Sequence, residues 1–236
     1  MPGTLITKIS QSVLDLFLPP SCFNCGVENS WLCQSCYDQI AFITSDVCER
    51  CGTPTDNKPL SCEQCNNNPL QYIDGIRVAS YFEGNPIRVG VHWLKYRNHK
   101  AVALPLSQIL VNTYSQYQLN CNVIVPVPLH SSRYKERGYN QCELLAKPLG
   151  KLLNLPVNTK TLQRTQKTKS QMTLGAVERR KNVATAFKCY NNQLTNLNVL
   201  LIDDVCTTGS TLDSCAVALK ETGVKSVWGV TLAKAR

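Results

Sequence analysis

Two adjacent carboxylates followed by a cluster of hydroxyl groups carry the most distinctive chemistry in this sequence. Asp203 and Asp204 directly follow an apolar run, and after Cys206 come Thr207, Thr208, Gly209, Ser210 and Thr211. At the carboxyl end of a sheet strand, such carboxylates accept hydrogen bonds from vicinal hydroxyls or hold a divalent cation. A turn of small residues that opens a helix presents backbone N–H groups to an anion. The stretch is therefore typical of a sugar-phosphate site.

The flanking residues predict the elements that position this site. Residues 199–202 are all apolar and half of them are β-branched, as in a strand that is buried on both faces of a parallel sheet. A helical pattern of apolar residues runs from Leu212 to Leu219, and Gly223 ends it. The alternative is an ordinary strand-to-helix loop in which Asp and Thr act as helix caps. A Walker-type loop fits poorly, because no Gly-Lys-Ser/Thr follows the strand.

The run 199–211 closely resembles the signature by which type I phosphoribosyltransferases bind 5-phosphoribosyl 1-pyrophosphate. The resemblance implies that Asp203 and Asp204 contact the ribose hydroxyls. It also implies that the loop from Thr207 to Thr211 holds the 5′-phosphate, and that Mg²⁺ accompanies the ligand.

Four Cys-x-x-Cys pairs in the first third of the chain predict two metal sites. Two residues between cysteines let both sulfurs of a tight turn face one ion, and two such turns complete a tetrahedral Cys₄ site. We expect two zinc ions with a structural role, because a closed Cys₄ site has no open coordination position. The short loops favour pairing of neighbouring turns, and crossed pairing is left open. The expected ligands are Cys22, Cys25, Cys33, Cys36, Cys48, Cys51, Cys62 and Cys65.

The residues that follow these pairs support tight turns. Gly26 and Gly52 come directly after the first and third pairs, where the turn needs a left-handed backbone, and Asn66 after the fourth pair tolerates it. Disulfides are the alternative use of these cysteines, and a cytosolic location would disfavour them. The remaining cysteines lack metal spacing and are expected to be mostly small core residues: Cys121, Cys142, Cys189, Cys206 and Cys215.

Composition limits the classes of protein and partner. The 236 residues are enough for one α/β domain with a small appendage, and a hydrophobic content of 43% indicates a packed core. A net charge of +9 favours polyanionic partners such as nucleic acid, nucleotides or pyrophosphate without choosing among them. Residues 1–20 predict an amphipathic helix rather than a signal peptide, since Asp15 interrupts the apolar run. With no apolar segment of membrane-spanning length, we expect a cytoplasmic protein.

The rest of the chain predicts alternating strands and helices. A change of composition at residues 66–69 suggests three units, namely the amphipathic helix 1–20, a double zinc ribbon 21–68 and a sheet domain 69–236. Strands are expected at 76–82, 123–128 and 227–232, and helices at 86–95, about 100–117 and 141–153.

A basic segment follows the strand expected at 123–128. Arg133, Lys135 and Arg137 alternate with other residues before Gly138, at the carboxyl end of a strand where open α/β sheets bind ligands. Arginine binds phosphate oxygens two at a time, which favours a phosphate site, and a solvated basic loop is the alternative. Aromatic residues that would stack on bases, such as Tyr134 and Tyr139, are too few to distinguish nucleic-acid binding from core or surface roles.

The segment from Arg133 to Gln141 is similar to one in the ComF family of competence proteins, which carry Arg-x-x-x-Arg-Gly-Tyr-Asn-Gln after a strand that ends in proline. The order of zinc module and phosphoribosyltransferase-type domain also matches this family over nearly the whole chain. The resemblance makes Arg133 and Arg137 candidates for pyrophosphate or DNA phosphates. It extends to Arg164, Gln171, Arg180 and Asn182, of which Arg164 and Arg180 are further phosphate candidates.

These observations predict a doubly wound parallel sheet of the type I phosphoribosyltransferase kind, preceded by a Cys₄ double zinc ribbon. The resemblance implies a protein that binds phosphoribosyl pyrophosphate, or a related ribose phosphate, with Mg²⁺. It further implies cytoplasmic handling of single-stranded DNA during natural transformation, together with DNA-uptake proteins. The alternatives are an active phosphoribosyltransferase of nucleotide or salvage metabolism with an unidentified acceptor, and a zinc-ribbon scaffold whose sheet domain binds nothing.

Overall fold

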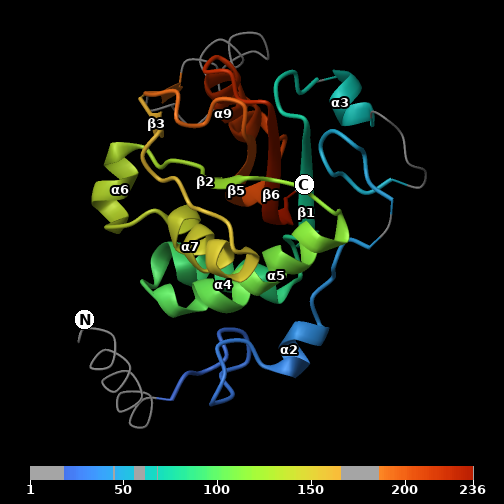
Figure 1. Ribbon diagram of the computed structural model, residues 1–236. Coiled ribbons are helices and arrows are strands. Elements are labelled where there is room, and N and C mark those ends of the chain that lie inside the picture. Colours follow the sequence, from blue (N-terminus) through green and yellow to red (C-terminus); the bar gives the residue numbers. More distant parts are fainter. Residues whose placement is uncertain (1–18, 45, 56–61, 68, 166–185, 236) are drawn as a thin grey trace.

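A four-stranded sheet in which every pairing is parallel forms the centre of the protein (Figure 1). The computed structural model describes residues 19–44, 46–55, 62–67, 69–165 and 186–235. The strands lie in the order β1 (Gly75–Tyr81), β6 (Ser226–Lys234), β5 (Asn198–Cys206) and β2 (Val123–Pro126). The parallel sheet predicted from the apolar runs is confirmed, whereas the helix expected at 1–20 lies outside the described residues except for its last two.

Helices make up much of the remaining described chain. In chain order they are α2 (Gln34–Asp38), α3 (Glu63–Asn67), α4 (Pro86–Tyr96), α5 (Ala103–Gln116), α6 (Ser131–Arg137), α7 (Gln141–Leu153) and α9 (Ser210–Lys220), with a 3₁₀ turn, η1 (Lys100–Val102), before α5. In this part of the chain no helix is long and apolar enough to cross a membrane.

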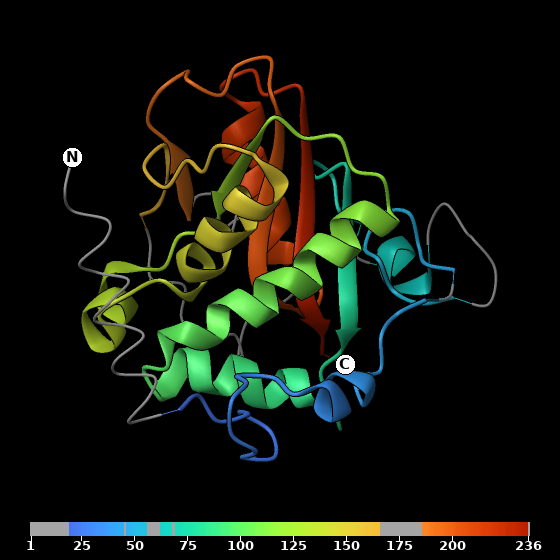
Figure 2. The same cartoon turned by 60° about the horizontal axis from the view of Figure 1, so that its bottom comes forward.

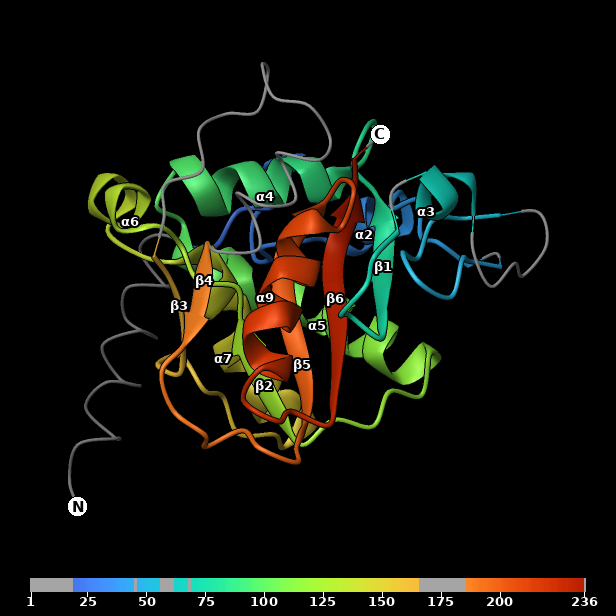
Figure 3. The same ribbon diagram turned by 90° about the horizontal axis from the view of Figure 1, so that it is seen from above.

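Both faces of the sheet are covered, because successive side chains of a strand point to opposite sides. On β5, Leu200 and Ile202 pack with α4, α5 and α7, whereas Val199 and Leu201 pack with α9. Figure 2 shows α4, α5 and α7, coloured green to yellow, in front of the sheet, and Figure 3 shows α9 in front of it from another direction. This arrangement confirms the doubly wound fold.

Asparagine caps start two of the predicted helices. The Asn85 side chain accepts a hydrogen bond from the Ile87 amide before α4, with Pro86 in the first turn, and Asn140 does the same for the Cys142 amide before α7. These caps satisfy N–H groups that have no partner within the helix, and each contributes about 1 kcal/mol. The predicted starts at 86 and 141 are therefore confirmed.

Two segments differ from their prediction. The basic segment, for which no helix was predicted, forms α6, which begins where His130 Nδ1 accepts from the Ser132 amide and ends at Gly138 with φ of 79°. Strand β5 does not end at residue 202 but continues to Cys206, since β6 pairs with it along this length. Asp203 and Asp204 are therefore strand residues, and pairing with β6 fixes their backbone.

The second cysteine-rich segment and residues 41–43, which precede it, cover the outer edge of β1. The Ile76 amide donates to the Arg50 carbonyl at 2.8 Å, and the Ile43 amide donates to the Ala79 carbonyl at 2.9 Å. Unpaired strand edges promote pairing with other chains, so this cover protects the sheet. A short antiparallel pair, β3 (Leu162–Arg164) with β4 (Phe187–Cys189), packs beside α9.

Gly26 and Gly52 provide a matched test of how the second cysteine-rich segment docks on β1. Both have positive φ, 80° and 68°. A Cβ at Gly26 would meet nothing within 4 Å, whereas a Cβ at Gly52 would lie 2.5 Å from the Ile76 carbonyl oxygen. We expect Gly26→Ala to cost about 1 kcal/mol of unfolding free energy from backbone strain alone, and Gly52→Ala to cost about 2 kcal/mol more from overpacking. Denaturant titration of the zinc-loaded variants checks this, and equal losses would contradict the docking.

Candidate functional site

The eight cysteines of the four Cys-x-x-Cys pairs form two separate clusters. The sulfur atoms of Cys22, Cys25, Cys33 and Cys36 all lie within 4.8 Å of one another, and so do those of Cys48, Cys51, Cys62 and Cys65. Neighbouring turns are thus paired, as the short loops favoured. Zn–S bonds of about 2.3 Å place tetrahedral sulfurs about 3.8 Å apart, and the Cys48–Cys65 and Cys51–Cys62 separations are 3.9 and 3.5 Å. Both clusters fit structural zinc.

The two clusters repeat the same backbone pattern. The amide of the third cysteine donates to the first sulfur in each, Cys33 to Cys22 at 3.5 Å and Cys62 to Cys48 at 3.3 Å. The left-handed backbone expected at Gly26 and Gly52 is present. The expectation for Asn66 is wrong, because α3 continues through this residue. Of the other five cysteines, all but the half-buried Cys189 are buried.

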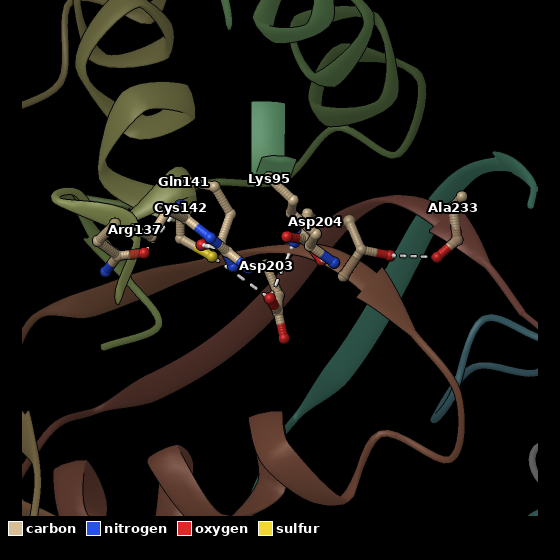
Figure 4. Close-up of polar contacts among 9 residues, drawn as sticks. Lys95, Arg137, Gln141, Cys142, Asp203, Asp204 and Ala233 are labelled. Atoms are coloured by element: carbon tan, nitrogen blue, oxygen red, sulfur yellow. Dashed lines mark hydrogen bonds and ion pairs between the residues drawn. The ribbon is translucent and has the colours of Figure 1, made fainter. Parts of the chain in front are cut away.

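The two aspartates at the end of β5 meet different partners (Figure 4). The Asp204 carboxylate is buried and its Oδ1 lies 2.7 Å from Lys95 Nζ at the end of α4. Its Oδ2 is buried and has no hydrogen-bond partner among the described residues. Burial lowers the pKa of Lys95, but the charge and the hydrogen bond of Asp204, together with the charge of Asp203, raise that pKa overall, so Lys95 is a cation near neutral pH.

The hydrogen bonds that Asp203 accepts from the described residues come from neutral donors. Its Oδ1 accepts from the Cys142 thiol at 3.3 Å and from the Asp204 amide at 2.9 Å. Burial, followed by the neighbouring Asp204 charge, raises the pKa of Asp203 to about 7. Burial and the Asp203 charge hold the pKa of Cys142 well above its usual value, so the thiol keeps the proton that it donates.

The loop from Thr207 to Thr211 leads directly from β5 into α9. Gly209 has φ of 85° and is the residue before the first turn of α9, and no side chain caps this helix. Thr208 and Ser210 are exposed, with their hydroxyl oxygens 2.7 Å apart. The Ser210 amide donates to Thr208 Oγ1 at 3.3 Å, and the amides of a helix start that lack a partner can bind an anion. We call residues 207–211 the phosphate loop below.

The predicted phosphate-binding arginines do not all converge on this region. Arg164 on β3 is half-buried and lies over the Phe187 ring. It is close enough to Asp203 and Arg133 for their charges to affect its pKa, which burial lowers overall. Arg133 is exposed on α6, 3.6 Å from Glu136, and Arg137 donates to Gln141 and lies over the Tyr96 ring. Arg180, with Gln171 and Asn182, lies outside the described residues.

Sequence reasoning missed two residues of this site and left the role of a third open. Lys95 was expected only as the end of a helix, and no spacing connects it to Asp204, 109 positions later. Cys142 was expected as a core residue, which its burial confirms, but its bond to Asp203 was not foreseen. Tyr139 is unsuited to stacking on bases, because it is buried and its hydroxyl donates to the Leu94 carbonyl.

The Lys95–Asp204 pair predicts a stability effect that depends on which partner is removed. In Lys95→Met the buried Asp204 carboxylate loses its only counter-ion in the described structure, so we expect a loss of about 3 kcal/mol in unfolding free energy. Lys95→Met combined with Asp204→Asn should recover most of it, because no isolated charge remains. Denaturant titrations of the single and double variants measure this, and additive losses would contradict the pairing.

The raised pKa of Asp203 predicts a pH-dependent gain on its neutralisation. The folded state holds this proton up to about pH 7, whereas the unfolded chain releases it near pH 3.8, so ionisation weakens the fold as pH rises between these values. We expect Asp203→Asn to be more stable than wild type above pH 7, by on the order of 1–4 kcal/mol, and equal to it near pH 4. Thermal unfolding across this range without Mg²⁺ checks it, and a gain independent of pH would contradict it.

Comparison with known proteins finds one family model and several solved structures that are similar to parts of this chain. A family model described as a double zinc ribbon domain matches residues 13–66. Among solved structures, the glutamine phosphoribosylpyrophosphate amidotransferase of Bacillus subtilis matches at a TM-score of 0.43 and 12% identity, over 60% of this chain and 30% of its own. The purine phosphoribosyltransferase of Pyrococcus horikoshii matches at a TM-score of 0.36 and 19% identity, over 55% of this chain and 70% of its own.

Curated relatives match over almost the full length. The DNA utilization protein YhgH of Escherichia coli K12 is 28% identical over 90% of this chain and 96% of its own. Competence protein ComFC of Bacillus subtilis is 28% identical over 81% of this chain and 79% of its own. Competence protein F of Haemophilus influenzae is 30% identical over 89% of this chain and 94% of its own. With this identity across both the ribbons and the sheet, the chain belongs to the ComF family of competence proteins.

Proposed function

We propose that this protein binds 5-phosphoribosyl 1-pyrophosphate, or a related ribose 5-phosphate, together with Mg²⁺. The observation that carries the proposal is the meeting of two unlike features at the carboxyl end of β5. One is a carboxylate pair with an unpartnered oxygen at Asp204, and the other is an uncapped helix start behind the phosphate loop. A ribose phosphate is the ligand whose hydroxyls suit the first and whose phosphate suits the second.

The ends of the ligand would meet different groups. The carboxylates of Asp203 and Asp204 would accept hydrogen bonds from the ribose hydroxyls. Thr207, Thr208, Ser210 and Thr211 would surround the 5′-phosphate, with Gly209 letting the backbone approach it. Four cationic side chains are our candidates for binding the pyrophosphate or DNA phosphates: Arg133, Arg137, Arg164 and Arg180. Mg²⁺ would neutralise the negative charge of the ligand that these arginines do not pair with.

We further propose that the protein acts in cytoplasmic handling of single-stranded DNA during natural transformation, with DNA-uptake proteins as partners. The names of the relatives, which refer to competence and to DNA utilization, support this role. Tyr96 on α4 and Tyr134 on α6 are exposed, and Arg137 of α6 lies over the Tyr96 ring. Exposed aromatic rings among cations suit a flexible strand, because bases stack on the rings while phosphates meet the charges.

Calorimetry with phosphoribosyl pyrophosphate and Mg²⁺ tests the ligand. We expect saturable binding to the zinc-loaded wild type, and at least about 100-fold weaker binding to Asp203→Asn/Asp204→Asn, since a hydrogen bond to a charged group contributes about 1.5–3 kcal/mol. The control is Glu28→Gln/Asp38→Asn, which removes two exposed carboxylates from the first ribbon and changes net charge equally. Equal binding by the two double variants, or none by wild type, would contradict the proposal.

The role in DNA handling is tested by titrating the wild type with a single-stranded oligonucleotide, with and without the ribose ligand. A change in oligonucleotide affinity must appear equally in ligand affinity, because coupling between two binding sites is reciprocal. We expect Tyr96→Ala/Tyr134→Ala to bind the oligonucleotide at least tenfold more weakly than wild type, because about 1–3 kcal/mol of stacking is lost per base. Ligand binding without any oligonucleotide binding would instead favour an active phosphoribosyltransferase with an unidentified acceptor.

A further inference from the structure

A short segment between the second ribbon and β1 contacts both the ribbon and the phosphate loop. Residues 70–73 follow the last cysteine pair and lead into β1, and we call them the brace. Leu70 and Ile73 of the brace are buried in the same core cluster as Cys48, Cys51 and Cys65. This cluster also contains Leu212 of α9, so the brace lies where the ribbon meets the helix that carries the phosphate loop.

Asp213 fastens the brace to α9. Its Oδ1 accepts hydrogen bonds from the amides of Gln71, Tyr72 and Ile73 at 3.1, 2.8 and 3.0 Å. An aspartate in the first turn of a helix commonly serves that helix's own free amides, or repels an anion that approaches them. Here the carboxylate is held by amides from another segment. Asp213 therefore does not bond the first amides of α9, and the amides of residues 71–73 already stabilise its negative charge.

The brace also touches the ribbon on one side and the phosphate loop on the other. Arg50, between the two cysteines of the third pair, donates from its guanidinium to the Leu70 carbonyl at 2.9 Å. The Leu70 side chain lies against Gly209, where an added Cβ would be 3.2 Å from Leu70 Cδ1 and 2.7 Å from Ile76 Cδ1. Gly209 is the left-handed residue of the phosphate loop, so its position depends on the side chains packed against it.

We propose that residues 70–73 brace the phosphate loop against the second ribbon, and that Asp213 is a positioning residue that holds this brace. The second ribbon then forms part of the support of the loop rather than an independent module. A loop held in its binding conformation before the ligand arrives binds more tightly, because less ordering remains to be done. The consequence for ligand affinity rests on the proposed function, whereas the consequence for the loop itself does not.

Amide hydrogen exchange of the ligand-free, zinc-loaded protein tests the brace directly. We expect Asp213→Ala to raise exchange at residues 207–212 at least tenfold. Asp213→Asn should give a smaller increase, since its amide oxygen still accepts. Arg50→Met should loosen the same amides from the ribbon side without removing a zinc ligand. Wild-type exchange at 207–212 in both Asp213→Ala and Arg50→Met would overturn the proposal.

Lys220→Met is the matched control. Lys220 is at the other end of α9 and lies 2.9 Å from Asp74, so it also joins α9 to the start of β1 but has no contact with the phosphate loop in the described structure. We expect its exchange at 207–212 to equal that of wild type. An increase as large as that of Asp213→Ala would show that any loss at this junction loosens the protein generally, and would overturn the specific role of Asp213.

Calorimetry with ribose 5-phosphate provides the second measurement. We expect Asp213→Ala to bind at least tenfold more weakly than wild type, with Asp213→Asn between them and Lys220→Met unchanged. If wild type binds and Asp213→Ala binds equally, the brace has no role in the site and the inference fails. If wild type does not bind but exchange follows the predicted order, the proposed ligand fails while the brace stands.

Discussion

Two neighbouring carboxylates at the end of a buried strand impose the main electrostatic constraint on this fold. Like charges on adjacent residues in a region of low dielectric cannot both ionise at ordinary pH without help. The structure resolves the conflict unequally. Lys95 from α4 pairs with Asp204, whereas the donors that Asp203 meets among the described residues are neutral and its pKa rises to about 7. The positions of α4 and α7 at this edge are therefore electrostatic requirements as well as packing ones.

Each ribbon gathers four sulfurs in a cluster that fits a zinc ion. The expected zinc would add its binding free energy to the stability of these short segments. The second cluster is also part of the sheet core, because Cys48, Cys51 and Cys65 are buried together with Ile76. Ribbon and sheet thus share a single core on this side, and the edge of β1 is covered by the chain that holds the metal site.

Local patterns predicted most of the fold and the chemistry-bearing loop. Apolar patterns located the main strands and helices, and cysteine spacing located both clusters, since each depends on residues close in sequence. The pairing of Lys95 with Asp204 and the bonds from the brace to Asp213 join residues more than 100 positions apart, and no local pattern encodes such contacts. Helix α6 was missed for another reason, because its cap is a histidine rather than a usual capping residue.

The groups left unsatisfied at the carboxyl end of the sheet point to what this edge is for. Protein interiors rarely leave buried polar atoms without partners, yet Asp204 Oδ2 has none among the described residues. The start of α9 likewise lacks a side-chain cap, although a suitable aspartate lies three residues inside it and serves the brace instead. Each feature costs stability in the empty protein. Donors for a carboxylate and an anion for a helix start would relieve both, and one ligand with hydroxyls and a phosphate carries both groups.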